Sequence, residues 1–77
     1  MKVRVLLFAA LREKLGKNEL VVELPAPCPV SGLQEHLSID KSLWSSLAFA
    51  VNQTYVPANT LLRDGDEVAL IPPVAGG

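Results

Sequence analysis

The chain has 77 residues, 49% of them hydrophobic, which is enough for one small domain with a hydrophobic core and for no second domain. Its formal net charge of −1 excludes the basic surplus with which nucleic-acid-binding domains neutralise phosphates. One cysteine, Cys28, and one histidine, His36, exclude an internal disulfide and a zinc site, so we expect no bound metal.

The sequence has no segment of the kind that takes a protein into a membrane. No apolar run approaches the roughly 20 residues of a membrane span, and the residues after Met1 alternate as in a strand rather than forming a signal peptide. Five of the seven basic residues lie within the first 17 positions, which we interpret as an ordinary solvated surface rather than a site for an acidic partner. We expect a cytoplasmic protein that binds neither membrane nor nucleic acid.

The first third of the sequence predicts two strands joined by a short helical turn. Residues 3–8 alternate and then become continuously apolar, as in a strand that enters a core. Residues 9–15 contain good helix formers, and Gly16 suits the position just after a helix. Residues 18–24 predict a second strand, antiparallel to the first, and the three prolines that follow should prevent further regular pairing.

The middle of the sequence predicts the main helix. Val30, Leu33 and Leu37 recur at the spacing of one helix face, which should pack on the sheet. Ser31 and Gln34 have the spacing of a capping box.

A second, shorter helical piece is predicted within residues 39–47. Leu43, Trp44 and Leu47 suit its buried face, and Asp40 suits its N-cap. We interpret Trp44 as a core residue rather than a stacking platform.

The last third predicts a hairpin and a turn. Residues 48–51 and 54–56 have strand patterns and flank Asn52-Gln53, although the turn lacks the glycine typical of such hairpins. Leu61-Leu62 should anchor the next loop in the core, and Asp64-Gly65-Asp66 predicts a tight turn.

The final predicted strand completes a recognisable architecture. Residues 67–71 form this strand, which should lie beside the first one. The sequence therefore predicts an α+β fold, a mixed sheet with one main helix across it, as in the β-grasp of ubiquitin-like proteins. The domain should span residues 1–71, followed by a flexible, extended tail over residues 72–77.

Two prolines and two glycines set this tail apart. Pro72 and Pro73 cannot complete a sheet ladder and should stiffen the start of the tail. Its six residues reach about 20 Å when extended at roughly 3.3–3.6 Å each. Gly76 and Gly77 have no side chains, so they suit a narrow slot and leave the terminal carboxylate accessible. The alternative is a frayed terminus without a function.

Side chains for catalysis are scarce. Gly16-Lys17 lacks the other residues of a phosphate-binding loop, and no Gly-x-Ser-x-Gly nucleophile elbow occurs. His36 should lie on the solvated face of its helix. Cys28 offers a sulfur for a persulfide, but no neighbouring cation in the sequence would activate it, so we interpret it as a space-filling loop residue.

Four segments stand out as a set: residues 8–13 (FAALRE), 50–53 (AVNQ), 64–68 (DGDEV) and 72–77 (PPVAGG). Together and in this order, they resemble the MoaD family, the small sulfur-carrying subunit of molybdopterin synthase. The resemblance covers almost the whole chain and is weakest from Ala26 to Leu47. The sequence departs from the family pattern at Ile71, where an aromatic residue is frequent, and at Ser31-Gly32.

The resemblance implies a carrier that is not catalytic by itself. An adenylating, E1-like activating enzyme would use ATP to couple AMP to the carboxylate of Gly77, and sulfur from a persulfide donor would then replace AMP to leave a thiocarboxylate. In a heterotetramer with the large subunit of molybdopterin synthase, the tail would deliver this sulfur to the pterin precursor of the molybdenum cofactor. The carrier itself would bind no cofactor.

The resemblance also implies roles for other residues. Those that thread the partner's active site with the terminal glycine are Val74, Ala75 and Gly76. Those that contact partner proteins are Phe8, Arg12, Ile71, Pro72 and Pro73. Whether Phe8 is a binding anchor or a core residue stays open at this point.

Other functions also fit a terminal Gly-Gly. A thiamine-pathway sulfur carrier usually has a shorter link between its first two strands, so the turn at residues 12–16 favours the molybdopterin family. A carrier for tRNA thiolation and a ubiquitin-like protein modifier remain alternatives, and Pro72-Pro73 favours the first reading over them. A purely structural binding module would not need the Gly-Gly ending.

Overall fold

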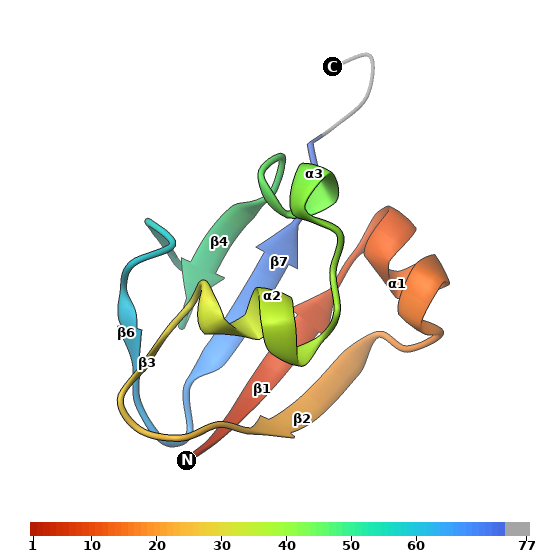
Figure 1. The fold of residues 1–77 in the computed structure, drawn as a ribbon. Coiled ribbons are helices and arrows are strands. Elements are labelled where there is room, and N and C mark those ends of the chain that lie inside the picture. The colour runs from red at the N-terminus through yellow and green to blue at the C-terminus, as the bar shows by residue number, and fades with distance from the viewer. Residues whose placement is uncertain (74–77) are drawn as a thin grey trace.

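Strands from both ends of the chain form one mixed sheet in the computed structural model, which describes residues 1–73 (Figure 1). The sheet has five strands in the order β2-β1-β7-β4-β5. Their bounds are Lys2–Leu7 for β1, Glu19–Glu23 for β2, Ala48–Val51 for β4, Thr54–Val56 for β5 and Glu67–Ile71 for β7. The helices are α1 (Ala9–Leu15), α2 (Gly32–His36) and α3 (Lys41–Trp44), and a separate two-stranded sheet joins β3 (Cys28–Pro29) to β6 (Leu61–Leu62).

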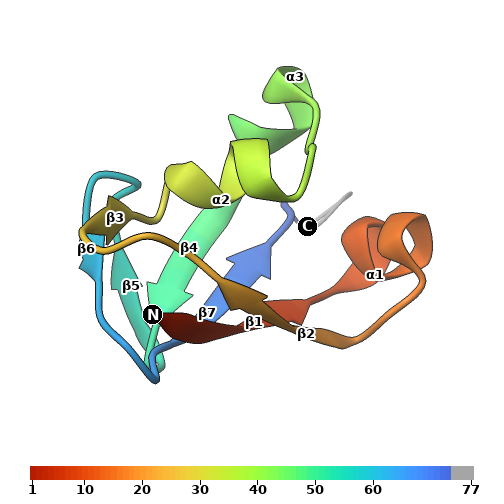
Figure 2. The ribbon, with the colours of Figure 1, turned by 60° about the horizontal axis from the view of Figure 1, so that its bottom comes forward.

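The centre of the sheet is the parallel pair β1 and β7, which the sequence predicted as neighbours. The pairing aligns Arg4 with Glu67 and Leu7 with Leu70. β2 adds to the other edge of β1 in antiparallel orientation, also as predicted. Helices α2 and α3 lie over one face of this sheet, and α1 lies beyond the end of β1 (Figure 2). No helix within residues 1–73 is long and apolar enough to cross a membrane.

Alternation along the strands separates a buried face from an open one. In β1, Val3, Val5 and Leu7 are at most 2% exposed, whereas the residues between them face the other side. The buried side chains of β7 continue this layer with Val68 and Leu70. Helices α2 and α3 cover it from above, so the hydrophobic core lies between the helices and one face of the sheet.

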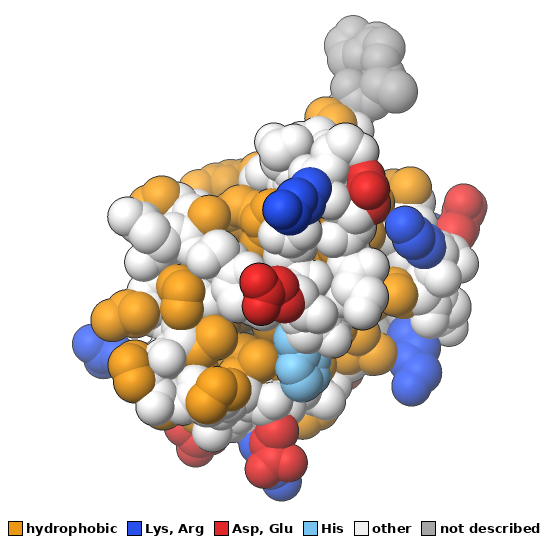
Figure 3. Space-filling view, viewed as in Figure 1, with side chains coloured by type: hydrophobic (Ala, Val, Ile, Leu, Met, Phe, Trp, Pro, Cys, Tyr) orange, Lys and Arg blue, Asp and Glu red, His pale blue; other side chains and the backbone are white. Residues whose placement is uncertain are grey.

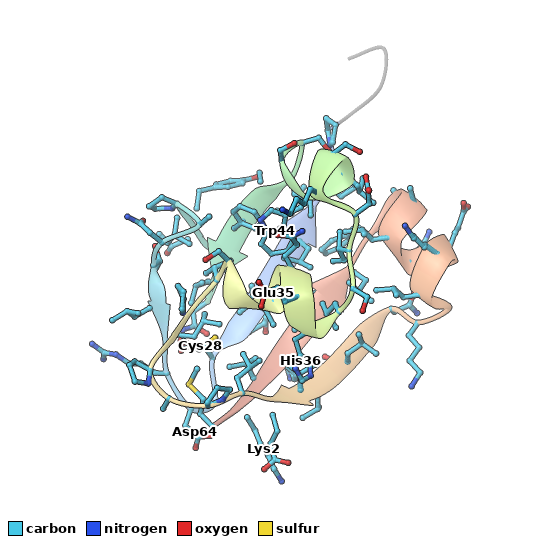
Figure 4. All side chains as sticks on the ribbon, viewed as in Figure 1. Lys2, Cys28, Glu35, His36, Trp44 and Asp64 are labelled. Carbon is cyan, nitrogen blue, oxygen red and sulfur yellow. The ribbon has the colours of Figure 1, made fainter. Side chains whose placement is uncertain are left out.

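Trp44 belongs to this core, as predicted. It ends α3 and lies over the sheet between α3 and α2 (Figure 4), and its side chain is 9% exposed. The ring packs against Phe49 of β4 with a centroid distance of 4.8 Å. Such tilted aromatic pairs add to the free energy gained by burial.

The predicted turn at residues 64–66 fastens β7 to the start of β1. Gly65 has a φ of 87°, which glycine adopts without strain. The backbone N–H of Lys2 donates to Asp64 Oδ1 at 2.7 Å, and the N–H of Gly65 donates to the Lys2 carbonyl at 2.7 Å. Lys2 and Asp64 accordingly lie close together at the lower end of the sheet (Figure 4). The turn is therefore a clamp between segments far apart in the sequence.

The β4–β5 hairpin forms without a glycine. Asn52 and Gln53 have φ values of 50° and 70°, the left-handed pair that a two-residue turn requires. Asparagine tolerates this conformation better than most residues. Asn52 is also held from outside the hairpin, because its Oδ1 accepts the N–H of Glu67 at 3.1 Å and its amide donates to Asp66 at 3.0 Å.

The predicted N-cap of α3 is confirmed. Asp40 accepts the backbone N–H groups of Ser42 at 3.1 Å and Leu43 at 3.4 Å. The hydroxyl of Ser42 also donates to this carboxylate, and these hydrogen bonds lower the pKa of Asp40 below its usual value.

The predicted capping box at the start of α2 is wrong. Ser31 has helical φ and ψ angles of −59° and −22°, and its side chain makes no capping hydrogen bond. The side-chain amide of Gln34 instead donates to the carbonyl of Ile39 at 3.2 Å, beyond the other end of the helix. The start of α2 is held by a backbone bond, since the N–H of Ser31 donates to the carbonyl of Ala58 at 2.9 Å.

The small sheet β3–β6 also departs from expectation. The prolines around it were predicted to prevent regular pairing, but Cys28 pairs with Leu62 and Pro29 with Leu61. A proline can occupy such an edge position when its missing N–H faces away from the partner strand. Of the two predicted core leucines, Leu62 is buried at 4% exposure, whereas Leu61 is 60% exposed.

Steric constraints explain why a glycine, Gly32, stands at the start of α2. A Cβ atom at this position would lie 2.4 Å from the sulfur of Cys28, which is only 7% exposed. The thiol therefore occupies the space that any other residue at position 32 would need. The interpretation of Cys28 as a space-filling residue agrees with this packing.

We predict that Gly32→Ala lowers the free energy of unfolding by about 1–3 kcal/mol, a common cost of inserting a methyl group into a packed core. In a Cys28→Ala background the same change should be neutral or slightly stabilising, because the sulfur is gone and alanine favours a helix over glycine. Urea unfolding of the wild type, both single variants and the double variant measures this coupling. Equal effects of Gly32→Ala in both backgrounds would contradict it.

Candidate functional site

The two central strands, β1 and β7, place the predicted contact residues Phe8 and Ile71 at one edge of the sheet. Because β1 and β7 are parallel, both end at the same edge. Phe8 follows β1, and Ile71 ends β7. Pro72, half-buried, and Pro73, exposed, continue from Ile71. The structure thus brings together the start of the predicted tail and two of the predicted contact residues.

Beside this edge, the open face of the sheet contains an apolar hollow with a volume of about 460 Å³. It lies opposite the helices, since Leu6 and Ala69 alternate with the buried Leu7 and Leu70. The hollow is lined by Leu6, Phe8, Ala50, Gln53, Tyr55, Glu67, Ala69 and Ile71.

Small residues in the middle of a row create the hollow. Across four strands, Leu6 pairs with Ala69, Ala69 with Ala50, and Ala50 with Tyr55. The two alanines leave space between the larger side chains at either end of the row. Tyr55 is 72% exposed and Phe8 is 44% exposed, so apolar and aromatic surface is left open to a partner.

A sharp turn after β1 keeps Phe8 at the surface. Phe8 itself is extended, with φ −128° and ψ 154°, and the next residue, Ala9, has a left-handed φ of 48°. The Phe8 carbonyl then accepts the N–H of Leu11 at 3.1 Å, and Leu11 enters the core with no exposed surface. The chain therefore buries Leu11 in place of Phe8, and Gly16 ends the helix as predicted, with a φ of 72°.

Arg12 lies in a neighbouring, more polar hollow of about 420 Å³. This polar hollow is lined by Leu6, Leu7, Phe8, Arg12, Asn18 and Glu19. Leu6 and Phe8 border both hollows, so they form a ridge between the two. The predicted contact residues Phe8, Arg12 and Ile71 thus belong to one continuous surface.

The remaining predicted site residues, Val74, Ala75, Gly76 and Gly77, lie outside the described residues. Within residues 1–73, Tyr55 lines the apolar hollow but was not predicted from the sequence as a site residue. Alternation already placed Tyr55 in a strand, and a large aromatic residue on the open face of an edge strand is a signal for binding. Tyr55 is far from Phe8 in the sequence, so the sequence alone did not indicate that Phe8, Tyr55 and Ile71 line the same hollow.

The apolar hollow is suited to binding a partner rather than to catalysis. Among its lining residues only Glu67 carries a charge at neutral pH, and its carboxylate is paired with Arg4. Within residues 1–73, no group of three or more histidine, cysteine or acidic side chains is placed to hold a metal ion.

Cys28 and His36 lie away from this surface. They border a hollow on the helix side, together with Glu35 (Figure 4). Cys28 is buried and His36 is exposed, as predicted. On the same face, Lys and Arg side chains form no single patch, and several lie near Asp or Glu side chains (Figure 3), which agrees with an ordinary solvated surface.

Comparisons with known proteins support a carrier. Residues 5–77 match the model of the ThiS family. The chain is 40% identical over 81 residues to the molybdopterin synthase sulfur carrier subunit of Escherichia coli strain K12, an alignment that covers 97% of this chain and 99% of that protein.

Two solved structures are similar throughout. Small archaeal modifier protein SAMP1 from Haloferax volcanii superimposes with a TM-score of 0.84 at 22% identity and full coverage of both chains, which shows a shared fold. A chain in the complex of subunits 1 and 2 of molybdopterin-converting factor from Helicobacter pylori gives a TM-score of 0.70 at 27% identity, again with full coverage of both chains. The predicted ubiquitin-like β-grasp fold is confirmed.

The exposure of Phe8 separates the two roles that the sequence left open. We predict that Phe8→Ala lowers the free energy of unfolding by about 1 kcal/mol or less, as for most surface changes. The adjacent Leu7→Ala, at 2% exposure, should cost about 2–5 kcal/mol and serves as the matched core control. Urea unfolding of both variants measures the difference. If Phe8→Ala proves as costly as Leu7→Ala, Phe8 is a core residue and not part of a binding surface.

Proposed function

This chain belongs to the ThiS family, and from that premise we propose that it is the sulfur carrier subunit of a molybdopterin synthase. In this proposal the sulfur is carried as a thiocarboxylate on Gly77. The family match extends through Gly77, and a named sulfur carrier subunit is 40% identical over nearly the whole chain.

The position of the apolar hollow is the observation that carries the proposal. It opens at the end of β7, where Ile71 lines it and Pro72 and Pro73 follow. A partner that covers the hollow therefore lies beside the start of the tail. The domain supplies binding energy at this surface, and the residues that follow it supply the reacting carboxylate.

The activation chemistry follows from the weakness of a carboxylate as an electrophile. In the proposal, the carboxylate of Gly77 attacks the α-phosphate of ATP on an E1-like activating enzyme, which releases pyrophosphate and leaves an acyl-adenylate. A persulfide then attacks the acyl carbon and expels AMP. A second thiol reduces the resulting acyl disulfide, which leaves the thiocarboxylate on the carrier and a disulfide on the donor side.

Transfer takes place on the large subunit of the synthase. In the proposal, the thiocarboxylate sulfur replaces an oxygen substituent on a carbon of the pterin precursor, so that a C–O bond breaks as the C–S bond forms. Water then cleaves the acyl–sulfur bond, which leaves the sulfur on the precursor and restores the carboxylate of Gly77. The Helicobacter pylori complex of subunits 1 and 2 supports a large-subunit partner for this chain. The same proposal includes assembly with the large subunit as a heterotetramer in the cytoplasm. It also assigns the use of ATP to the activating enzyme alone.

Two observations favour the molybdopterin pathway over thiamine synthesis. Helix α1 occupies the link between β1 and β2, where thiamine carriers usually have a shorter connection. The sequence identity of 40% is to a molybdopterin synthase subunit.

Deleting Gly77, or adding one residue after it, should abolish sulfur transfer to the pterin precursor. Neither change should alter the melting temperature, because a terminal glycine has no side chain to bury. Molybdopterin formation with the purified large subunit and activating enzyme provides the measurement, and His36→Ala, an exposed change on the helix face, is the control. Full activity of an extended chain that remains unprocessed would rule out a terminal carboxylate carrier.

A further inference from the structure

Three charged side chains form a wall across the open face of the sheet. Arg4 of β1 lies between Glu19 of β2 and Glu67 of β7. Its Nε atom is 3.2 Å from Oε1 of Glu19, and its Nη2 atom pairs with Oε2 of Glu67. The charged wall therefore spans the three neighbouring strands β2, β1 and β7.

The charged wall borders both hollows of the candidate site. Glu67 lines the apolar hollow, and Glu19 lines the polar hollow. Leu6, the next residue along this face of β1, pairs with Glu19 and lines both hollows. A protein that covers the ridge of Leu6 and Phe8 therefore comes into contact with the charged wall as well.

The charged wall contains two carboxylates and one guanidinium, so it carries one surplus negative charge. Two carboxylates share one guanidinium, and each of them uses one oxygen in this pairing. Among the hydrogen bonds within residues 1–73, the second oxygen of Glu19 and that of Glu67 accept none. The side chains of Glu19 and Glu67 are 49% and 25% exposed, so both carboxylates are accessible.

Glu67 is also fixed in position. Its backbone N–H donates to Asn52 Oδ1 at 3.1 Å, its carbonyl accepts the N–H of Asn52 at 2.8 Å, and its carboxylate is bound by Arg4. A carboxylate held in this way loses little side-chain entropy when it binds a cation.

We propose that the charged wall of Arg4, Glu19 and Glu67 is a docking site for a lysine or arginine side chain of the large synthase subunit. The inference rests on the proposed function and adds the chemistry of the partner surface. A partner that covers both hollows removes water from two carboxylates, Glu19 and Glu67, that are both paired with Arg4. Burying the surplus negative charge is costly unless the partner supplies a positive one. The charged wall thereby selects a partner with a basic residue next to its apolar contact.

The test compares charge-removing variants in complex formation with the large subunit. Glu19→Gln, Glu67→Gln and the double variant keep side-chain size and remove the acceptor charge. Glu23→Gln is the matched control, because it removes the same charge from the same face of β2 but pairs with Lys2, farther from both hollows. Calorimetry at low and at high ionic strength gives the dissociation constants, and melting curves of the free variants check folding.

We expect the double variant to bind about tenfold more weakly at low ionic strength, with a flatter salt dependence than the wild type. Glu23→Gln should stay within about twofold of the wild type. Unchanged or tighter binding by the folded double variant would overturn the inference, and tighter binding would indicate an acidic partner surface. Failure of the unsubstituted chain to bind the large subunit would overturn the proposed function itself, and the inference with it.

Discussion

Parallel pairing between β1 and β7 joins the two ends of the chain, and the site depends on this pairing more than on any other contact. It is a long-range contact, so its formation costs loop-closure entropy that contacts between the two segments must offset. The clamp at Asp64 and Gly65, which holds both residues against Lys2, does so at the start of the pair. At the other end of the two strands, the pairing places Phe8 beside Ile71. The chain therefore leaves β7 next to the apolar hollow.

The open face of the sheet contains two regions that contribute differently to binding a partner. The apolar hollow offers area without charge, which suits affinity, whereas the charged wall of Arg4, Glu19 and Glu67 suits the choice and orientation of a partner. The side chains of these two regions include no cysteine, serine or histidine, and both carboxylates of the charged wall are paired with Arg4. This arrangement fits a protein that presents a reactive terminus to other proteins, which then supply the catalytic groups.

Local signals predicted most elements of the fold, because their physics is local. Gly16 after a helix, Asp40 before one and the turn around Gly65 each depend on a few neighbouring backbone groups. Apart from the capping box of Ser31 and Gln34, a local pattern that does not form, the errors concern contacts between distant segments. Pairing of Cys28 with Leu62 depends on how the loops fold over the core, and the surface shared by Phe8 and Tyr55 depends on strand order. No local pattern in the sequence contains that information.

Intact-mass analysis of the chain after reaction with its activating enzyme, ATP and a persulfide donor tests the central claim most directly. A carrier should gain the mass difference between sulfur and oxygen, at Gly77, and should do so equally in a Cys28→Ser variant. The product should survive a reducing thiol, because a thiocarboxylate contains no S–S bond to exchange. A gain of a whole sulfur atom that requires Cys28 and disappears on reduction would contradict the account, since the sulfur would then be carried by the thiol rather than by the C-terminus.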